Sequence, residues 1–289
     1  MAAPVARLTI HEEDEYMNEC RNNLLANSAI TQKYHTWIAP QIHPSLGPLP
    51  YPHVKVLSSS DPIRLEEIFA TEFYEWKNYE RVPRYPYVAL DCEFFHGQNN
   101  EPFNALTQLA VRRRPNACHI VVAQTSWLKV IPPSFRLLLL DHRVIKLTHN
   151  GKHDTNSIRK WVSPTGEHLA CRSFLDIHHI ARLLWSLKGN AAKASKRTIP
   201  SLTSLTEEFL GISLPDPRAP RGRTWADEDI LAKMMVYAVK DAWATLETFH
   251  AMKVHIDRIA GSEAAGNALV QEVVTFELAK EGEADVMVL

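Results

Sequence analysis

Two acidic side chains stand together at the end of a short apolar segment. Residues 88–90 form an apolar run with the length of a buried strand, and Asp91 and Glu93 follow it with one residue between them. Because successive side chains of a strand point to opposite faces, Asp91 and Glu93 share one face and Cys92 points to the other. Neighbouring carboxylates at a buried strand end repel each other unless a cation lies between them. The pattern indicates either a metal site or a solvated strand end that happens to carry acids.

Further acids lie near the ends of later predicted elements. Asp154 follows a predicted strand and begins a predicted helix, a position that is also typical of acids at helix N-termini. Asp241 lies within a long predicted helix, and Tyr237 precedes it by four residues, so the two share one helix face. A tyrosine at the core edge that is hydrogen-bonded to its neighbour explains this pair equally well. The ordered combination of these residues is more informative than any one of them.

The ordered combination resembles the DEDD superfamily of 3′–5′ exonucleases, in the tyrosine-bearing branch that includes ribonuclease D and the exonuclease domain of the Werner-syndrome helicase. The resemblance covers residues 60–255, and its motifs are LDCEF at 90–94, HNGKHD at 149–154 and YAVKDAWATL at 237–246. In the histidine-bearing branch a histidine lies five residues before the last aspartate. This position is Val236 here, so the sequence departs from that branch.

The resemblance implies hydrolysis of phosphodiester bonds at the 3′ end of nucleic acid, with release of nucleoside 5′-monophosphates. It makes Asp91, Glu93, Asp154 and Asp241 the metal-binding acids and Tyr237 the residue that positions the attacking water. Oxygen ligands suit Mg²⁺ or Mn²⁺, and two such ions can activate a water on one side and stabilise the leaving oxygen on the other. A tyrosine is a weak base near neutral pH, so we expect Tyr237 to orient the water rather than deprotonate it.

The expected partner is a single-stranded nucleic acid with a free 3′ end, either RNA or DNA. The net charge of the chain is −1, so phosphate groups must bind to a local patch. Basic residues are concentrated in the loops 187–197 and 214–223. The candidate contacts are Phe94, Asn150, Lys193, Lys196, Arg197, Arg221 and Arg223. The alternatives are solvated loops for the basic residues and core packing for Phe94. Three histidines near the motifs, His96, His149 and His153, we interpret as structural or surface groups.

The elements around the motifs predict how the acids are brought together. Strands at 106–111 and 119–123 follow the first strand through short links, which favours an antiparallel meander. Farther along, strands at 145–149 and 174–177 alternate with helices, which favours parallel crossovers. The predicted fold is therefore α/β and ribonuclease-H-like, with a mixed central sheet flanked by helices. The long helix that carries Asp241 is expected to begin near Thr224.

Segment boundaries and cysteine usage give the remaining expectations. We expect an N-terminal extension over 1–58 that is proline-rich in its second half, an exonuclease domain over 59–260, and a C-terminal helix with an acidic tail over 261–289. The 4 cysteines contain no CxxC pair and predict neither a zinc site nor a disulfide framework. No signal peptide and no membrane-spanning run are present in the sequence, so we expect an intracellular protein, nuclear or cytoplasmic, without a membrane partner. No protein partner is assigned.

The main alternative is a catalytically silent nucleic-acid-binding or scaffold module of the same fold. Such a module would be expected to have lost one of the four acids, and all four are present. An endonuclease of the same fold is a third possibility, against which the Tyr-x-x-x-Asp helix argues.

Overall fold

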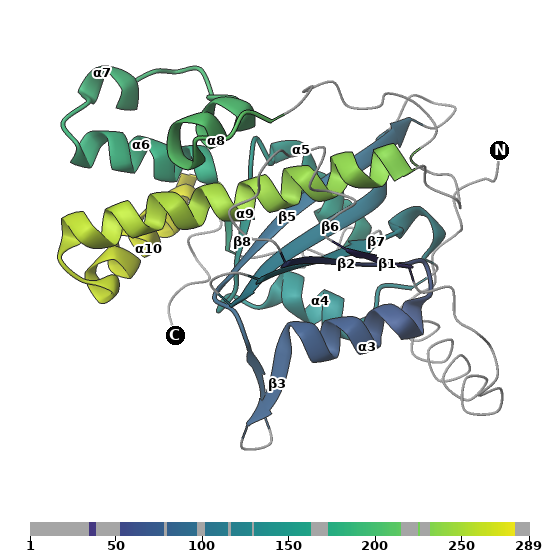
Figure 1. Cartoon of the computed structure of the whole chain (residues 1–289). Coiled ribbons are helices and arrows are strands. Elements are labelled where there is room, and N and C mark those ends of the chain that lie inside the picture. The colour runs from purple at the N-terminus through teal and green to yellow at the C-terminus, as the bar shows by residue number, and fades with distance from the viewer. Residues whose placement is uncertain are drawn as a thin grey trace, which may run out of the picture.

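A computed structural model of the chain describes residues 35–38, 53–77, 80–96, 102–114, 117–128, 130–162, 173–214, 225 and 232–280. Figure 1 shows a central sheet with helices on both of its faces. The strands are β1 (His35–Ile38), β2 (His53–Ser59), β3 (Tyr74–Lys77), β4 (Glu80–Pro83), β5 (Tyr87–His96), β6 (Pro102–Arg114), β7 (Ala117–Ala123), β8 (Ile145–Thr148) and β9 (Phe174–Asp176). The helices are α3 (Pro62–Glu72), α4 (Pro133–Leu140), α5 (Lys152–Val162), α6 (Ile177–Leu187), α7 (Ala191–Ala194), α8 (Leu202–Leu210), α9 (Ala232–Ala260) and α10 (Glu263–Lys280), and a short 3₁₀ helix covers Thr125–Trp127.

The central sheet is mixed, as the sequence predicted. In the described residues its strands follow the order β1-β2-β7-β6-β5-β8-β9, while β3 and β4 form a separate hairpin. The strands β5, β6 and β7 form an antiparallel meander. Beyond β5, the strands β8 and β9 lie parallel to it and to each other. The predicted α/β fold with antiparallel and parallel strands is therefore confirmed.

The sheet also includes strands from the segment that we predicted to be an N-terminal extension. The strand β2 pairs in parallel with β7 over its whole length, and β1 pairs with β2. Val56 and Leu57 of β2 are both buried, one in the core on each face of the sheet. The strand was missed because the prolines before it suggested a linker, and residues 39–52 with those prolines lie outside the described residues. The three predicted segment boundaries stay a prediction.

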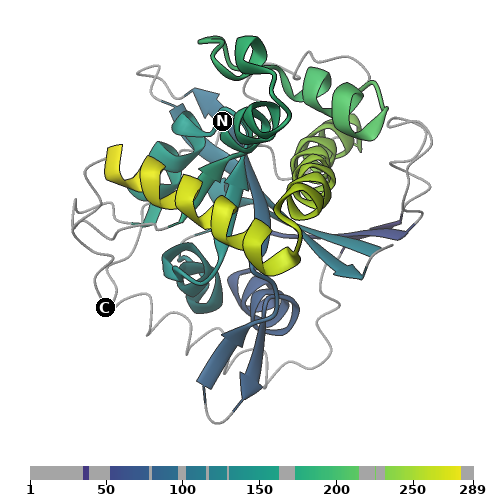
Figure 2. The same cartoon turned by 90° about the vertical axis from the view of Figure 1, so that its left-hand side faces the viewer.

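The two faces of the sheet bury separate hydrophobic cores. One core lies beneath α3 and α4 and includes Leu65, Leu90 and Phe135. The other lies beneath α6, α8 and α9 and includes Ala89 and Ala242. Figure 2 shows the same division, with α9 on one side of the sheet and α3 on the other. Because alternate residues of β5 enter different cores, its polar residues at odd positions must face α9.

The helix α9 crosses the sheet over β5 and β6 and is the longest of the described helices. Its apolar stripe is buried, at positions Met234, Ala238, Ala242, Leu246 and Phe249. The predicted start near Thr224 lies outside the described residues. None of the described helices is both long and apolar enough to cross a membrane.

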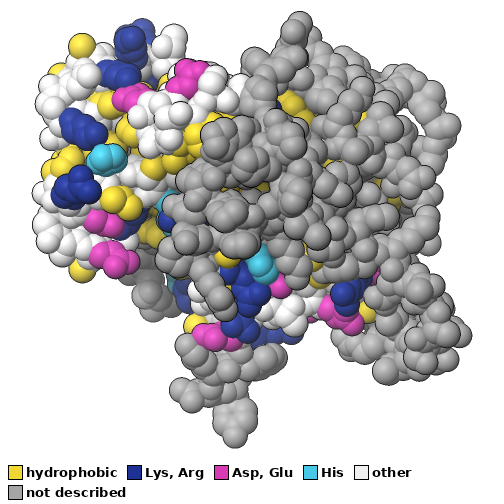
Figure 3. All heavy atoms as spheres, viewed as in Figure 1, with side chains coloured by type: hydrophobic (Ala, Val, Ile, Leu, Met, Phe, Trp, Pro, Cys, Tyr) yellow, Lys and Arg dark blue, Asp and Glu magenta, His cyan; other side chains and the backbone are white. Residues whose placement is uncertain are grey.

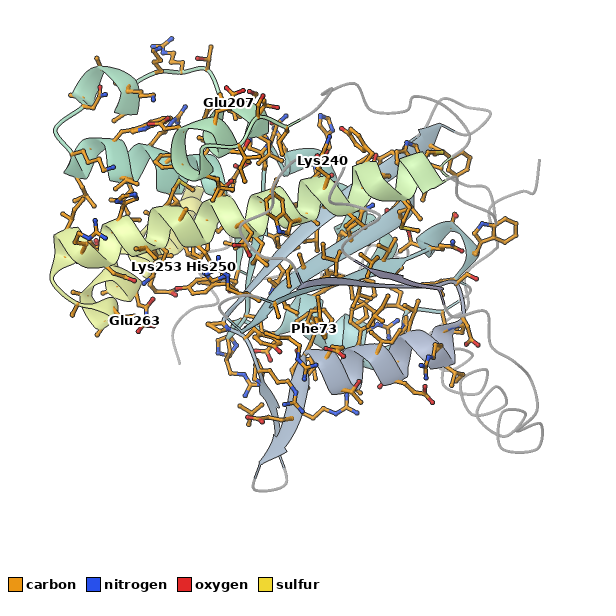
Figure 4. All side chains as sticks on the ribbon, in the orientation of Figure 1. Phe73, Glu207, Lys240, His250, Lys253 and Glu263 are labelled. Atoms are coloured by element: carbon orange, nitrogen blue, oxygen red, sulfur yellow. The ribbon has the colours of Figure 1, made fainter. Side chains whose placement is uncertain are left out.

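A histidine on α9 should limit stability in acid. Burial, with the charges of Arg112 and Lys253, lowers the pKa of His250 to about 3 (Figure 4). The unfolded chain takes up a proton below the ordinary pKa of 6.5 and the folded chain does not, so the free energy of unfolding falls as the pH drops below 6.5. Between neutral pH and pH 5, the wild type should lose about 2 kcal/mol of unfolding free energy through this residue, and His250→Leu should abolish that loss. Urea unfolding at neutral and acid pH measures the difference.

The matched control for this prediction is His142→Gln, which replaces an exposed histidine. It should keep the full acid-dependent loss of stability. If His250→Leu and the wild type lost the same free energy between neutral pH and pH 5, the role of His250 would be contradicted.

Candidate active site

Asp91 and Glu93 lie on the face of β5 that α9 covers. Ala89 packs into the core beneath α9, whereas Leu90 and Cys92 pack into the opposite core. Glu93 is only 8% exposed, so its carboxylate is largely removed from water. A shift in the pairing register of β5 with β6 follows Glu93. The two acids thus share one face, as the alternation along the strand predicted.

Asp154 is brought beside β5 by the turn between β8 and α5. The strands β5 and β8 run in parallel, with Ala89 paired to Leu147. The turn that follows Thr148 therefore lies at the same end of the sheet as Asp91. The first turn of α5 then carries Asp154, which is 7% exposed.

The sequence of this turn has a steric explanation. Asn150 has a φ of 54°, in the left-handed region that asparagine tolerates better than most residues. A Cβ on Gly151 would lie 2.3 Å from the side chain of Thr148, so only glycine fits without displacement. The backbone nitrogen of Gly151 donates to Oδ2 of Asp176 at 3.1 Å. The other oxygen of Asp176 accepts from the backbone nitrogen of His178, so one carboxylate ties this turn to the start of α6.

Tyr237 and Asp241 lie one turn apart on α9. The carboxylate of Asp241 lies close enough to the hydroxyl of Tyr237 for its charge to act on the phenol. Burial and the charges of Asp241 and Glu93 raise the pKa of Tyr237. The hydroxyl therefore stays protonated at neutral pH. The ring centroid of Trp225 lies 6.3 Å from that of Tyr237, so the tryptophan supports the tyrosine from one side.

The electrostatics show that the four acids converge. Burial raises the pKa of Asp91 well above its usual range. The charges of the other three acids raise it further: Glu93, Asp154 and Asp241. Burial also raises the pKa of Glu93, and Asp241 and Asp154 add to the effect. Since charges shift a pKa in this way only at short range, carboxylates from β5, α5 and α9 share one region.

The remaining two acids differ in what surrounds them. Burial raises the pKa of Asp154 to about 7, and the charge of Asp176 adds to the shift. Burial likewise raises the pKa of Asp241, against the opposing effects of Lys240, Tyr237 and His149. His149 also bonds through Nε2 to the carbonyl oxygen of Pro200 at 2.8 Å, which fixes its ring beside the acids.

The donor set suits a hard divalent cation. Carboxylate oxygens are the ligands that Mg²⁺ and Mn²⁺ prefer, and a shared cation removes the repulsion between buried acids. Among the residues that the structure describes, no three histidine, cysteine or carboxylate side chains are arranged as a set that could hold an ion as they stand. The acids are gathered, and ion binding would require them to turn toward a common centre.

The aromatic and asparagine candidates for nucleic-acid contacts lie in different surroundings. Phe94 packs against the core beneath α3 and α4, on the side away from Asp91 and Glu93. This position favours the alternative of core packing, while Phe95 packs on the α9 side. Asn150 is exposed in the turn before Asp154, and its left-handed backbone explains its presence without a ligand. A contact between either residue and nucleic acid stays a prediction.

The basic candidates lie on and after α7, and two lie outside the described residues. Lys193 forms an ion pair with Glu208 at 2.6 Å and lies 4.6 Å from the ring centroid of Trp185. Lys196 and Arg197 are exposed, and Figure 3 shows basic and acidic side chains intermixed on this part of the surface. The charge of Lys193 is thus already paired. Arg221 and Arg223 fall in a loop outside the described residues.

A comparison with models of protein families identifies the family of this chain. A family model described as a 3′–5′ exonuclease matches residues 67–257, a range that contains the four acids and Tyr237. The chain therefore belongs to the 3′–5′ exonuclease family, within the DEDD superfamily. A search of curated proteins finds no match.

Two solved structures resemble the fold. The EXO domain of Nibbler from Aedes aegypti matches with a TM-score of 0.52 and 16% identity, over 77% of this chain and 94% of that one. RNase D from Escherichia coli matches with a TM-score of 0.51 and 16% identity, over 74% of this chain and 48% of that one. At such identities the likeness concerns the fold alone, and it agrees with the ribonuclease-H-like arrangement that the sequence predicted.

Two residues near the acids have contacts that their sequence context did not indicate. Asp176 has the sequence signal of a helix N-cap, but its bond to Gly151 joins residues 25 positions apart. Lys240 is adjacent to Asp241 in the chain. Neighbouring residues of a helix do not ordinarily face each other, so the sequence did not indicate a contact between these two side chains. Local spacing predicts neither contact, because each depends on how the elements pack.

Proposed function

We propose that this protein is a metal-dependent 3′–5′ exonuclease that acts on RNA or single-stranded DNA and releases nucleoside 5′-monophosphates. The observation that carries the proposal is the convergence of four carboxylates beside Tyr237, in a chain of the 3′–5′ exonuclease family. Glu93 and Asp154 are buried, and Asp91 and Asp241 are half-buried. Bringing four acids together with partial burial costs folding free energy, so such a cluster is expected where it binds cations.

The proposed ligands of two Mg²⁺ or Mn²⁺ ions are Asp91, Glu93, Asp154 and Asp241. When bound, the ions would activate a water molecule and stabilise the leaving oxygen. Asp91 is the proposed shared ligand, because the charges of all three other acids act on it. The charge of Asp241 acts on Glu93 more strongly than that of Asp154 does, so we assign Glu93 and Asp241 to the first ion and Asp154 to the second.

Tyr237 is proposed to hold the attacking water in line. Its hydroxyl lies near the carboxylate of Asp241, and the phenolic oxygen can accept a hydrogen bond from water. Because its pKa is raised, Tyr237 keeps its proton and does not act as a base. The residue therefore contributes orientation rather than proton transfer.

Replacing Tyr237 with phenylalanine should slow the reaction without abolishing it. We expect Tyr237→Phe to lower kcat by about 10- to 100-fold, because the water loses one hydrogen bond that orients it, and to leave KM for the oligonucleotide unchanged. Steady-state rates on one substrate measure both constants. The control Tyr87→Phe removes a hydroxyl that bonds to Asn267, and should retain wild-type rates. A wild-type kcat for Tyr237→Phe would contradict the orienting role.

The direct test is degradation of matched 5′-labelled oligonucleotides by the full chain with Mn²⁺. The substrates are single-stranded RNA, single-stranded DNA and a duplex with a recessed 3′ end, all of one sequence. We expect a ladder that shortens one nucleotide at a time from the 3′ end and disappears with EDTA. Internal cuts would indicate an endonuclease. Binding of the oligonucleotide without any product would indicate the silent module.

A further inference from the structure

Lys240 is a buried lysine that lies among the acids themselves. Its side chain is 5% exposed, and its Nζ lies 3.7 Å from Oδ1 of Asp241. The same Nζ lies 4.4 Å from the centroid of the Tyr237 ring, within the range of a cation–π interaction. Lysine is almost never fully buried unless its charge is paired. The ammonium group is therefore held against two residues of the proposed site at once.

The charge of Lys240 acts beyond its immediate neighbour. It lowers the pKa of Glu93 as well as that of Asp241, against the effect of burial, which raises both. Glu93 belongs to β5 and Asp241 to α9, so the ammonium acts across the boundary between sheet and helix. One positive charge thus offsets part of the negative charge of these two acids.

We propose that Lys240 is a positioning residue of this site, a fixed positive charge that weakens the attraction of the acids for divalent ions and holds the Tyr237 ring in place. The proposal rests on the metal-dependent function proposed above. Without this charge the acids attract a divalent ion more strongly, because Coulomb attraction grows with the net negative charge. The Tyr237 ring also loses its cationic partner, so the orientation of its hydroxyl becomes less well defined. Tighter ion binding with a lower kcat is the expected combination.

The variants separate charge from packing. Lys240→Met and Lys240→Gln both remove the charge and keep a long side chain, whereas Lys240→Arg keeps the charge. Lys253 offers a matched control on the same helix, since it is 6% exposed and pairs with Asp257 four residues later. Figure 4 labels both lysines on α9, with Lys253 toward the α10 end. Lys253→Met therefore removes an equally buried ion pair outside the acid cluster.

The experiment measures Mn²⁺ binding by calorimetry and the melting temperature with and without Mn²⁺, on the full chain. We expect Lys240→Met to lower the dissociation constant for Mn²⁺ by at least about tenfold and to enlarge the rise of Tm that Mn²⁺ produces. Its kcat at saturating Mn²⁺ should fall while KM for the oligonucleotide stays constant. Lys240→Arg should restore the wild-type affinity within about twofold, and Lys253→Met should bind Mn²⁺ as the wild type does.

Several outcomes would overturn the proposal. Mn²⁺ affinity that is unchanged or weaker in both Lys240→Met and Lys240→Gln would show that the charge does not set ion binding. If neither neutral variant folded with or without Mn²⁺, while Lys253→Met did, Lys240 would be needed for folding alone. A wild type that binds no Mn²⁺ would refute the metal-dependent function, and with it this role. Unchanged affinity in variants of a wild type that binds Mn²⁺ refutes only the role of Lys240.

Discussion

Asp91→Asn should reduce the rate of nucleotide release at saturating Mn²⁺ by at least about 10³-fold. The substitution keeps the shape of the side chain and removes the charge that the proposed site needs most. Asp91 is the acid on which all three others act, so its loss weakens the ligand set of both proposed ions. Single-turnover degradation of a labelled oligonucleotide over a range of Mn²⁺ concentrations measures the effect and separates lost affinity from lost chemistry.

The same substitution should stabilise the protein when no metal is added. Desolvation and the charges of its neighbours disfavour the ionised form of Asp91, and asparagine avoids both penalties. We expect the free energy of unfolding of Asp91→Asn to exceed that of the wild type by about 1 kcal/mol or more in the presence of EDTA. A residue that served only the fold would give a loss of stability instead.

The adjacent residue gives the control. Cys92 points into the opposite core and is 5% exposed. Cys92→Ala should lose about 1–2 kcal/mol of stability by leaving a small cavity, and should keep the wild-type rate. The two neighbouring variants thus have opposite expected effects on stability and activity. Wild-type activity in Asp91→Asn would remove this acid from the proposed site.

Among the single substitutions described, Arg112→Met should lower the free energy of unfolding most, by about 3–5 kcal/mol at pH 8. Arg112 of β6 pairs with Glu247 of α9, and its Nε lies 3.2 Å from Oε1 of the glutamate. The Glu247 side chain is 1% exposed, so removal of the arginine leaves a buried charge without its partner. This pair joins the sheet to the helix that carries Asp241, and its loss should also lower activity. Urea unfolding measures the change.

The pH dependence of this variant identifies the cause. Burial already raises the pKa of Glu247, against the opposing effect of Arg112. Without the arginine, the glutamate is expected to bind a proton more readily when folded than when unfolded. The loss of stability should therefore shrink as the pH falls from 8 toward 5, because protonation removes the buried charge.

Two further variants complete this test. The double variant Arg112→Met/Glu247→Leu should recover most of the lost free energy, since an apolar pair leaves no unpaired charge. Arg64→Met breaks an ion pair with Glu67 whose side chains are 31% and 50% exposed, and should cost no more than about 1 kcal/mol. If the double variant were no more stable than Arg112→Met, the unpaired charge would not be the cause.

The sequence predicted those features that depend on short-range pattern. The spacing of Asp91 and Glu93 along a strand determines that they share a face, and the four-residue spacing of Tyr237 and Asp241 does the same on a helix. Asp61, which precedes Pro62, caps α3 for a local reason, with Oδ1 accepting from the backbone nitrogen of Ile63 at 2.8 Å. Gly211 ends α8 with a φ of 69° for a similar local reason.

Other features were missed because the local signal was weak or misleading. The prolines before β2 concealed a strand that is buried on both faces. A strand that lies between two others and is covered on both faces has no polar face, so its sequence lacks the alternation that would identify it. For Phe94 the sequence left base stacking and core packing open, because the residue is aromatic and adjacent to Glu93. Its place next to Cys92 in the opposite core follows from the same alternation that places the acids.

The sequence by itself determined which residues could form the site: four carboxylates and a tyrosine, in an order and spacing that resemble one superfamily. Only the tertiary structure decided that charges from β5, α5 and α9 act on one another, because the elements meet through strand pairing and helix packing over about 150 residues of chain. It also decided the surroundings of Lys240. A lysine beside an aspartate in a helix usually extends into solvent, and burial against Tyr237 is what turns this one into a charge of the site.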